Sequence, residues 1–160
     1  MSTTEYCDGS IRYLSPQDIE DINSFVILSI TPEEPIGVIE NSILHGAQSR
    51  PSMYRYYEET NDMATLAAVL LTSTIKAHAF LNGNKRTAFV SAVVFLRING
   101  YRFDPPLSET LTFCKGIAED QINMSQVAYW IATHSRPSDS ADLLSDCLHI
   151  VFSEYEGFRA

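Results

Sequence analysis

Apolar residues recur at helical spacing along most of the chain, and this pattern predicts a protein built from helices. In two stretches, residues 62–80 and 84–99, apolar side chains nearly encircle the helix, so we expect both helices to be buried at the centre. Helices with one apolar side are expected from residue 16 to a break at 31–35 and over residues 36–48, 108–119, 125–134 and 141–155. Strand signals are sparse. The predicted fold class is therefore all-α.

Local signals set the expected ends of these helices. Ser15 can cap the first helix, and Pro16 suits its first position. The second helix is expected to end at residues 49–51, because Pro51 has no N–H to donate to a helical hydrogen bond. Residues 52–61 would then form an aromatic, polar connection. Asn61 is the expected cap of the helix that follows.

The chain divides into three parts by composition. Residues 1–10 are expected to form a flexible lead, residues 11–136 a helical domain, and residues 137–160 a linker with a C-terminal helix. Within the domain, residues 101–106 are expected to form a turn. A length of 160 residues and a hydrophobic content of 45% fit one domain with an ordinary core.

Charge and cysteine usage exclude several classes of protein. The net charge of −9, with 11 Lys and Arg in no basic stripe, argues against nucleic-acid binding. The three cysteines are far apart and lack the spacing of a zinc site. The N-terminus lacks the apolar core of a signal peptide, and residues 63–71 are too few to cross a membrane. We therefore expect a cytoplasmic protein with no membrane contact.

Candidate chemistry concentrates where the two most apolar helices meet, at residues 78–87. Gly83 allows a sharp junction, and a helix starting at residue 84 or 85 would present its free N–H groups there. Lys85 and Arg86 add two cations, and arginine can bind phosphate through two nitrogens. Histidine titrates near neutral pH, so His78 could accept a proton from an attacking hydroxyl. A lone histidine at a helix end is usually structural, but these features together predict an anion site beside a base.

The segment His78-Ala-Phe-Leu-Asn-Gly-Asn-Lys-Arg86 resembles the Fic/Doc signature H-x-F-x-(D/E)-G-N-x-R. Lys85 stands where Fic adenylyltransferases have Gly, so the resemblance is closest to the Doc (death-on-curing) branch. Residues 13–18, 37–44 and 95–101 also look like segments of this family, and the resemblance covers roughly residues 11–136. It implies a compact helical domain around a central helix-loop-helix.

The resemblance also implies roles for the motif residues. His78 would be the general base, with Lys85 and Arg86 completing the catalytic set. Phe80 would anchor the loop to the core. The phosphate cradle would consist of Gly83, Asn84, Lys85 and Arg86, with Arg86 as the main phosphate clamp. ATP and Mg²⁺ are the implied cofactors. Asn82 occupies the position of the family's acidic metal ligand, and a neutral amide oxygen holds Mg²⁺ more weakly than a carboxylate.

Three activities stay open at this point. Lys85, together with Phe89 in place of the second arginine of Fic enzymes, favours Doc-like transfer of a phosphoryl group from ATP to a protein hydroxyl, as in a toxin. Fic-type adenylyl transfer is the second candidate, and a non-catalytic nucleotide- or protein-binding module is the third. The implied partners are a protein substrate and a small antitoxin-like inhibitor. The tail at residues 152–157 approaches the restraining motif of Fic proteins but has Phe152 where Ser or Thr belongs, so it is interpreted as packing or an interface.

Overall fold

A computed structural model of the chain describes residues 6–138. The helices are α1 Pro16–Ile30, α2 Asn41–Glu58, α3 Met63–Ala77, α4 Asn84–Ile98, α5 Leu107–Ala118 and α6 Met124–Thr133. Two small antiparallel pairs accompany them, β1 Cys7–Asp8 with β2 Ile11–Arg12 and β3 Tyr101–Phe103 with β4 Ser135–Pro137. The predicted all-α class is confirmed. The helix expected at 141–155 and the tail motif at 152–157 lie outside the described residues.

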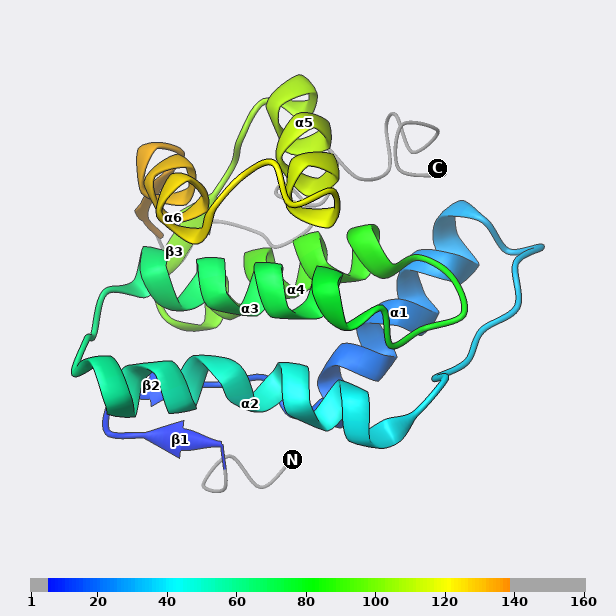
Figure 1. Ribbon diagram of the computed structural model, residues 1–160, viewed down its shortest axis with the longest axis horizontal. Coiled ribbons are helices and arrows are strands. Elements are labelled where there is room, and N and C mark those ends of the chain that lie inside the picture. The colour runs from blue at the N-terminus through cyan, green and yellow to red at the C-terminus, as the bar shows by residue number, and fades with distance from the viewer. Residues whose placement is uncertain (1–5, 139–160) are drawn as a thin grey trace.

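The two helices that flank the candidate motif form the centre of the domain, as expected. Figure 1 shows α3 and α4 running across the middle, with α2 on one side and α5 and α6 on the other. Helix α1 packs against α4. Most of α4 is buried, including Phe89, Phe95 and Leu96, each at most 1% exposed. None of the described helices has the length and apolar character needed to cross a membrane.

The start of α1 follows the predicted cap. The Asp18 backbone N–H donates to Ser15 Oγ at 3.0 Å, and the Ser15 N–H donates back to the Asp18 carboxylate at 2.8 Å. Pro16 occupies the first turn, where it displaces no helical hydrogen bond. This reciprocal cap fixes where α1 begins. It thereby fixes where the buried side chain of Asn23 meets the motif loop.

The second helix differs from its prediction at both ends. Helix α2 begins at Asn41 and runs through Pro51 to Glu58, so the expected connection at 52–61 is mostly helical. Pro51 removes the hydrogen bond that the carbonyl of Ala47 would have accepted. The Ser73 hydroxyl of α3 donates to that carbonyl at 3.0 Å instead. A tertiary partner therefore replaces the missing donor, and the helix continues past the proline.

Two further predictions need correction. Asp62 caps α3 in place of Asn61, because its carboxylate accepts the Thr65 N–H at 3.0 Å. Residues 101–103, expected as a turn, form β3, which pairs with β4 at the boundary between the expected domain and the expected linker. Phe103 explains this pairing, since its fully buried ring lies edge-on against Trp130 with ring centroids 5.2 Å apart.

Candidate functional site

The loop between α3 and α4 is sharply turned at both ends. Helix α3 ends at Ala77, three residues earlier than predicted, because His78 adopts the left-handed conformation with φ +48°. Gly83 is left-handed as well, with φ +72°, and α4 begins at the next residue. A side chain at position 83 would lie 3.0 Å from Ile27 Cδ1 and 3.4 Å from Asn23 Nδ2. Glycine is therefore needed there for its backbone conformation and for its small size.

Asn84 holds the loop closed from inside. Its side-chain oxygen accepts the Phe80 N–H at 3.0 Å, and its side-chain nitrogen donates to the Phe80 carbonyl at 2.9 Å. Asn84 is buried, and the ring of Phe80 lies in the core at 1% exposure. The Asn84 side chain is therefore occupied with loop closure, and only its backbone can serve a ligand. The sequence placed Asn84 in the phosphate cradle without showing this second role.

The connection between α1 and α2 lies alongside the same loop. The Ile39 N–H donates to the Ala79 carbonyl at 2.7 Å, and the Leu81 N–H donates to the Gly37 carbonyl at 3.0 Å. The Asn82 side-chain nitrogen donates to the Pro35 carbonyl at 3.0 Å. These bonds link segments about forty residues apart in the sequence, and no local pattern indicates them. They hold the motif loop against residues 35–39.

Asn23 ties the loop to α1 from the buried side. Its side-chain nitrogen donates to the Asn82 carbonyl at 2.8 Å and to Thr87 Oγ1 at 3.0 Å. Asn23 is 1% exposed and Thr87 is fully buried, so these bonds lie in the core. The backbone of the loop is thereby fixed relative to the first turn of α4. Sequence reasoning missed Asn23. The signal that could have indicated it is a polar residue at a position of α1 that faces the core.

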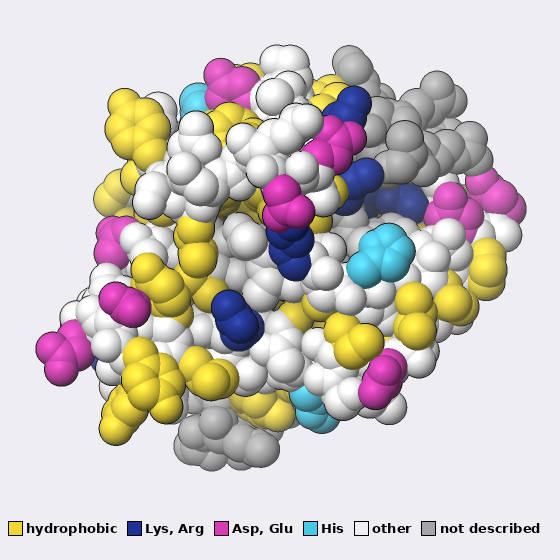
Figure 2. All heavy atoms as spheres, viewed as in Figure 1, with side chains coloured by type: hydrophobic (Ala, Val, Ile, Leu, Met, Phe, Trp, Pro, Cys, Tyr) yellow, Lys and Arg dark blue, Asp and Glu magenta, His cyan; other side chains and the backbone are white. Residues whose placement is uncertain are grey.

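The predicted site residues other than Phe80, which packs in the core, meet at one cavity of about 280 Å³. It is lined by His78, Leu81, Asn82, Gly83, Asn84, Lys85 and Arg86, with Glu34, Ile75 and Ala118 completing the wall. His78 is exposed and belongs to the same wall as the first turn of α4. In Figure 2, several Lys and Arg side chains run from the middle of this face toward its upper right, with Asp and Glu side chains beside some of them. The motif therefore places a histidine, a helix start and two cationic side chains around one space.

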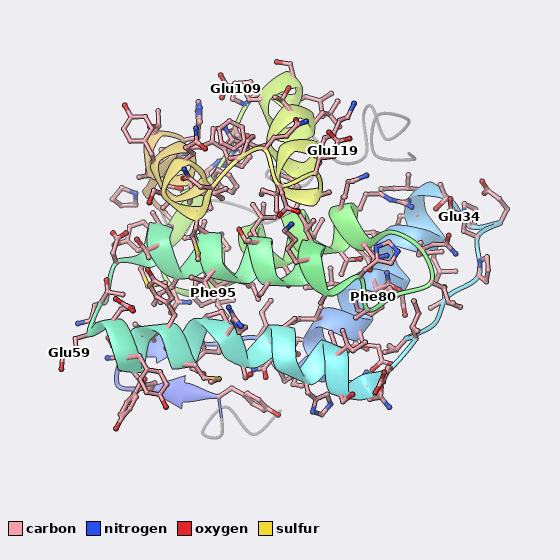
Figure 3. All side chains as sticks on the ribbon, in the orientation of Figure 1. Glu34, Glu59, Phe80, Phe95, Glu109 and Glu119 are labelled. Atoms are coloured by element: carbon pink, nitrogen blue, oxygen red, sulfur yellow. The ribbon has the colours of Figure 1, made fainter. Side chains whose placement is uncertain are left out.

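Arg86, the expected phosphate clamp, is buried and already paired within the protein. Its side chain is 2% exposed, and its Nη2 donates to Glu34 Oε2 at 2.9 Å. Its Nη1 donates to Thr31 Oγ1 at 2.8 Å, and the Thr31 hydroxyl donates to the same Glu34 oxygen at 2.8 Å. In Figure 3, Glu34 and Phe80 lie at the same end of the molecule, Phe80 within the loop that joins α3 to α4 and Glu34 in the connection that follows α1. Sequence reasoning missed Thr31 and Glu34, which sit in a helix break without any recognisable motif.

Lys85 directs its charge toward α5. Burial raises the pKa of the Cys114 thiol to about 12, although the nearby Lys85 cation acts to lower it. Cys114 is therefore an unreactive thiol in the core. Ala118, also on α5, lines the cavity. Lys85 thus lines the cavity and lies close enough to α5 for its charge to act on Cys114.

Few of the side chains at this cavity are suited to binding a metal ion. Among residues 6–138 there is no group of three or more His, Cys, Asp or Glu side chains suited to a metal ion. The Asn82 nitrogen is committed to Pro35, which leaves the amide oxygen as the atom that can face a cation. Mg²⁺ often takes only one or two protein ligands, with phosphate oxygens and water completing its shell. The residues therefore fit a Mg²⁺ ion carried by a nucleotide better than a metal held by protein alone.

Comparison with known proteins agrees with this geometry. The sequence model of the Fic/DOC family matches residues 13–96, which include α1 to α4 apart from the end of α4. The protein called Protein kinase doc from Escherichia phage P1 is 44% identical over 73 residues, which cover 45% of this chain and 56% of the phage protein. The match thus spans little more than half of that relative, and it agrees with the resemblance to the Doc branch. The chain belongs to the Fic/DOC family.

Proposed function

We propose that this protein transfers the γ-phosphoryl group of ATP to a hydroxyl group of another protein, as a Doc-like toxin. The observation that carries the proposal is the placement of His78, Gly83 and the first turn of α4 around one cavity. The phage relative of the chain is called a protein kinase, which supports the same chemistry.

The start of α4 supplies the phosphate-binding groups. Its first helical hydrogen bond runs from the Thr87 N–H to the Gly83 carbonyl at 2.8 Å. The N–H groups of the three preceding residues therefore come before the helical ladder and point toward the N-terminal end of the helix. This end also carries the positive pole of the helix dipole, and Lys85 adds a full charge. Such an arrangement suits the β- and γ-phosphates of a nucleotide.

In the proposed reaction, His78 accepts the proton of the attacking hydroxyl. The hydroxyl oxygen forms a bond to the γ-phosphorus, the bond from that phosphorus to the β,γ-bridging oxygen breaks, and ADP leaves. The negative charge of the transferred group and of the leaving diphosphate is stabilised by the N–H groups at the α4 start and by the cations of Lys85 and Arg86. Mg²⁺ bound to ATP would neutralise part of this charge, with the Asn82 amide oxygen as its protein ligand.

Adenylyl transfer is the second candidate, and two observations weigh against it. Lys85 stands at the position where Fic adenylyltransferases have Gly. Phe89 replaces the second arginine, and its ring is fully buried, 5.9 Å from that of Phe103. This position therefore has no group to offer a γ-phosphate. A non-catalytic binding module is the third candidate, favoured only by the neutral side chain of Asn82.

Mass spectrometry of a cell lysate treated with the protein, ATP and Mg²⁺ tests the proposal. We expect a phosphoryl group on a serine, threonine or tyrosine of one target, and no modification with a His78→Ala variant. An adenylyl group would select the second candidate instead. ATP binding without any modification would select the binding module. A small antitoxin-like inhibitor is also proposed, and adding it should suppress the modification.

A further inference from the structure

The guanidinium of Arg86 is a buried cation that needs a counter-charge. Arg86 is 1% exposed, and an unpaired charge at such a position would strongly destabilise the fold. Glu34 provides the counter-charge through the 2.9 Å contact to Nη2. The pairing is incomplete, since Arg86 Nε is buried without a hydrogen-bond partner among residues 6–138. The cation thus has bonding capacity that residues 6–138 do not fill.

Glu34 accepts a hydrogen bond from Nη2, the Arg86 nitrogen that lies nearest the proposed phosphate cradle. A Cβ added at Gly83 would lie 3.6 Å from Arg86 Nη2, so this nitrogen lies directly beside the loop. Glu34, Gly83 and Arg86 line the same cavity. The carboxylate of Glu34 therefore occupies the Arg86 side of the site in which we place the phosphates. An anion of the chain itself holds a position that suits an anion of the ligand.

The two partners differ in their freedom to move. The Arg86 side chain is 2% exposed and sits on the central helix α4, whereas the Glu34 side chain is 23% exposed and sits between helices. Glu34 can therefore turn toward solvent while Arg86 stays in place. A polyphosphate entering the cavity would repel the carboxylate and offer Arg86 several oxygens in its stead.

We propose that Glu34 is a placeholder anion: it neutralises Arg86 in the absence of ligand and is displaced by a phosphate group of the nucleotide. This inference rests on the proposed function, because it assumes that the cavity receives a polyphosphate. It makes Glu34 a determinant of nucleotide affinity that lies outside the motif. A residue of this kind opposes binding while it stabilises the empty protein.

Replacing Glu34 by glutamine separates these two effects. Glu34→Gln keeps the size and one acceptor oxygen but removes the charge, so the empty protein should unfold at a lower temperature than wild type. Its affinity for metal-free ATP and for tripolyphosphate should rise, with a Kd lower by about tenfold, because displacing a charge-assisted hydrogen bond no longer opposes binding. Glu40→Gln is the matched control, since Glu40 is exposed at the other end of the same connection.

Calorimetric titration and thermal unfolding of the full chain give both readouts. Lower stability together with tighter binding in Glu34→Gln, and neither in Glu40→Gln, is the expected result. Weaker binding in Glu34→Gln would overturn the inference, because it would make Glu34 a metal ligand or a support for Arg86. An affinity of Glu34→Gln equal to that of wild type would overturn the inference as well.

Two further measurements complete the design. If the glutamine variant does not fold, Glu34→Asp retains the charge on a shorter side chain and should show a smaller gain in affinity; no gain would refute the inference. If wild type and every variant fail to bind ATP and tripolyphosphate, the proposed function itself is refuted. If wild type binds ATP and neither Glu34 variant binds it more tightly, the inference about Glu34 is refuted and the proposed function is not.

Discussion

Replacing Asn82 with aspartate exchanges a hydrogen-bond donor for a metal ligand, and the two effects oppose each other. The Asn82 nitrogen donates to the Pro35 carbonyl at 3.0 Å, and a carboxylate cannot make this bond. A hydrogen bond of this kind contributes about 1 kcal/mol net, so the metal-free variant should melt about 3 °C below wild type. The new carboxylate oxygen would also face the Pro35 carbonyl oxygen, which adds to the loss.

Magnesium should reverse this loss. The added carboxylate contributes a full negative charge to the shell of the cation, whereas the wild-type amide contributes only a dipole. We therefore expect Mg²⁺ with ATP to raise the melting temperature of Asn82→Asp more than that of wild type. Modification of the target should increase and should reach half of its maximum at a lower Mg²⁺ concentration. The two assays are thermal unfolding across a Mg²⁺ series and mass-spectrometric quantification of the modified target.

The double variant Asn82→Asp with His78→Ala provides the control. It should keep the Mg²⁺-dependent rise in melting temperature but lose the gain in modification, because the acceptor hydroxyl has lost its base. A wild type that turns over well, with no change in Asn82→Asp, would refute the reasoning. In that case Asn82 is not a weakened ligand, and the metal is held in another way or is not used.

Three other variants test separate parts of the site. His78→Ala alone should reduce modification by roughly a hundred- to ten-thousand-fold while leaving the Kd for ATP almost unchanged, and a parallel loss of binding would contradict its role as a base. Gly83→Ala should lower the free energy of unfolding by about 1–2 kcal/mol, because alanine is strained at a positive φ, and should weaken ATP binding; denaturant unfolding and calorimetric titration measure the two effects. Ser15→Ala should lower the free energy of unfolding by about 1 kcal/mol through loss of the α1 cap, with unchanged activity once folded; an unchanged midpoint in urea would show that the cap is dispensable.

The sequence predicted those features that depend on neighbouring residues. The apolar sides of α3 and α4, the Ser15 cap and the turn at Gly83 each involve residues within a few positions of one another. The candidate site could be predicted for the same reason, because His78, the loop and the start of α4 all lie in one segment, residues 78–86.

Errors arose where the deciding partner lies far away in the chain. Helix α2 continues through Pro51 because the hydroxyl of Ser73 replaces the missing donor. Residues 101–103 became a strand because residues 135–137 pair with them. The ion pair of Arg86 with Glu34, 52 residues earlier, was likewise not indicated by any local pattern. No local pattern reveals such contacts, since the fold alone brings these residues together.

The bonds between the motif loop and residues 35–39 bear on whether this motif can be transplanted. Two backbone groups of the loop, the Ala79 carbonyl and the Leu81 N–H, find their partners in Ile39 and Gly37, and Asn23 accounts for a third. Residues 78–86 grafted onto an unrelated pair of helices would leave these groups without partners, and the loop would lose its shape. The smallest portable unit is therefore the assembly of α1, the α1–α2 connection, α3 and α4, and an engineer who wished to reuse this loop would have to transfer all of it.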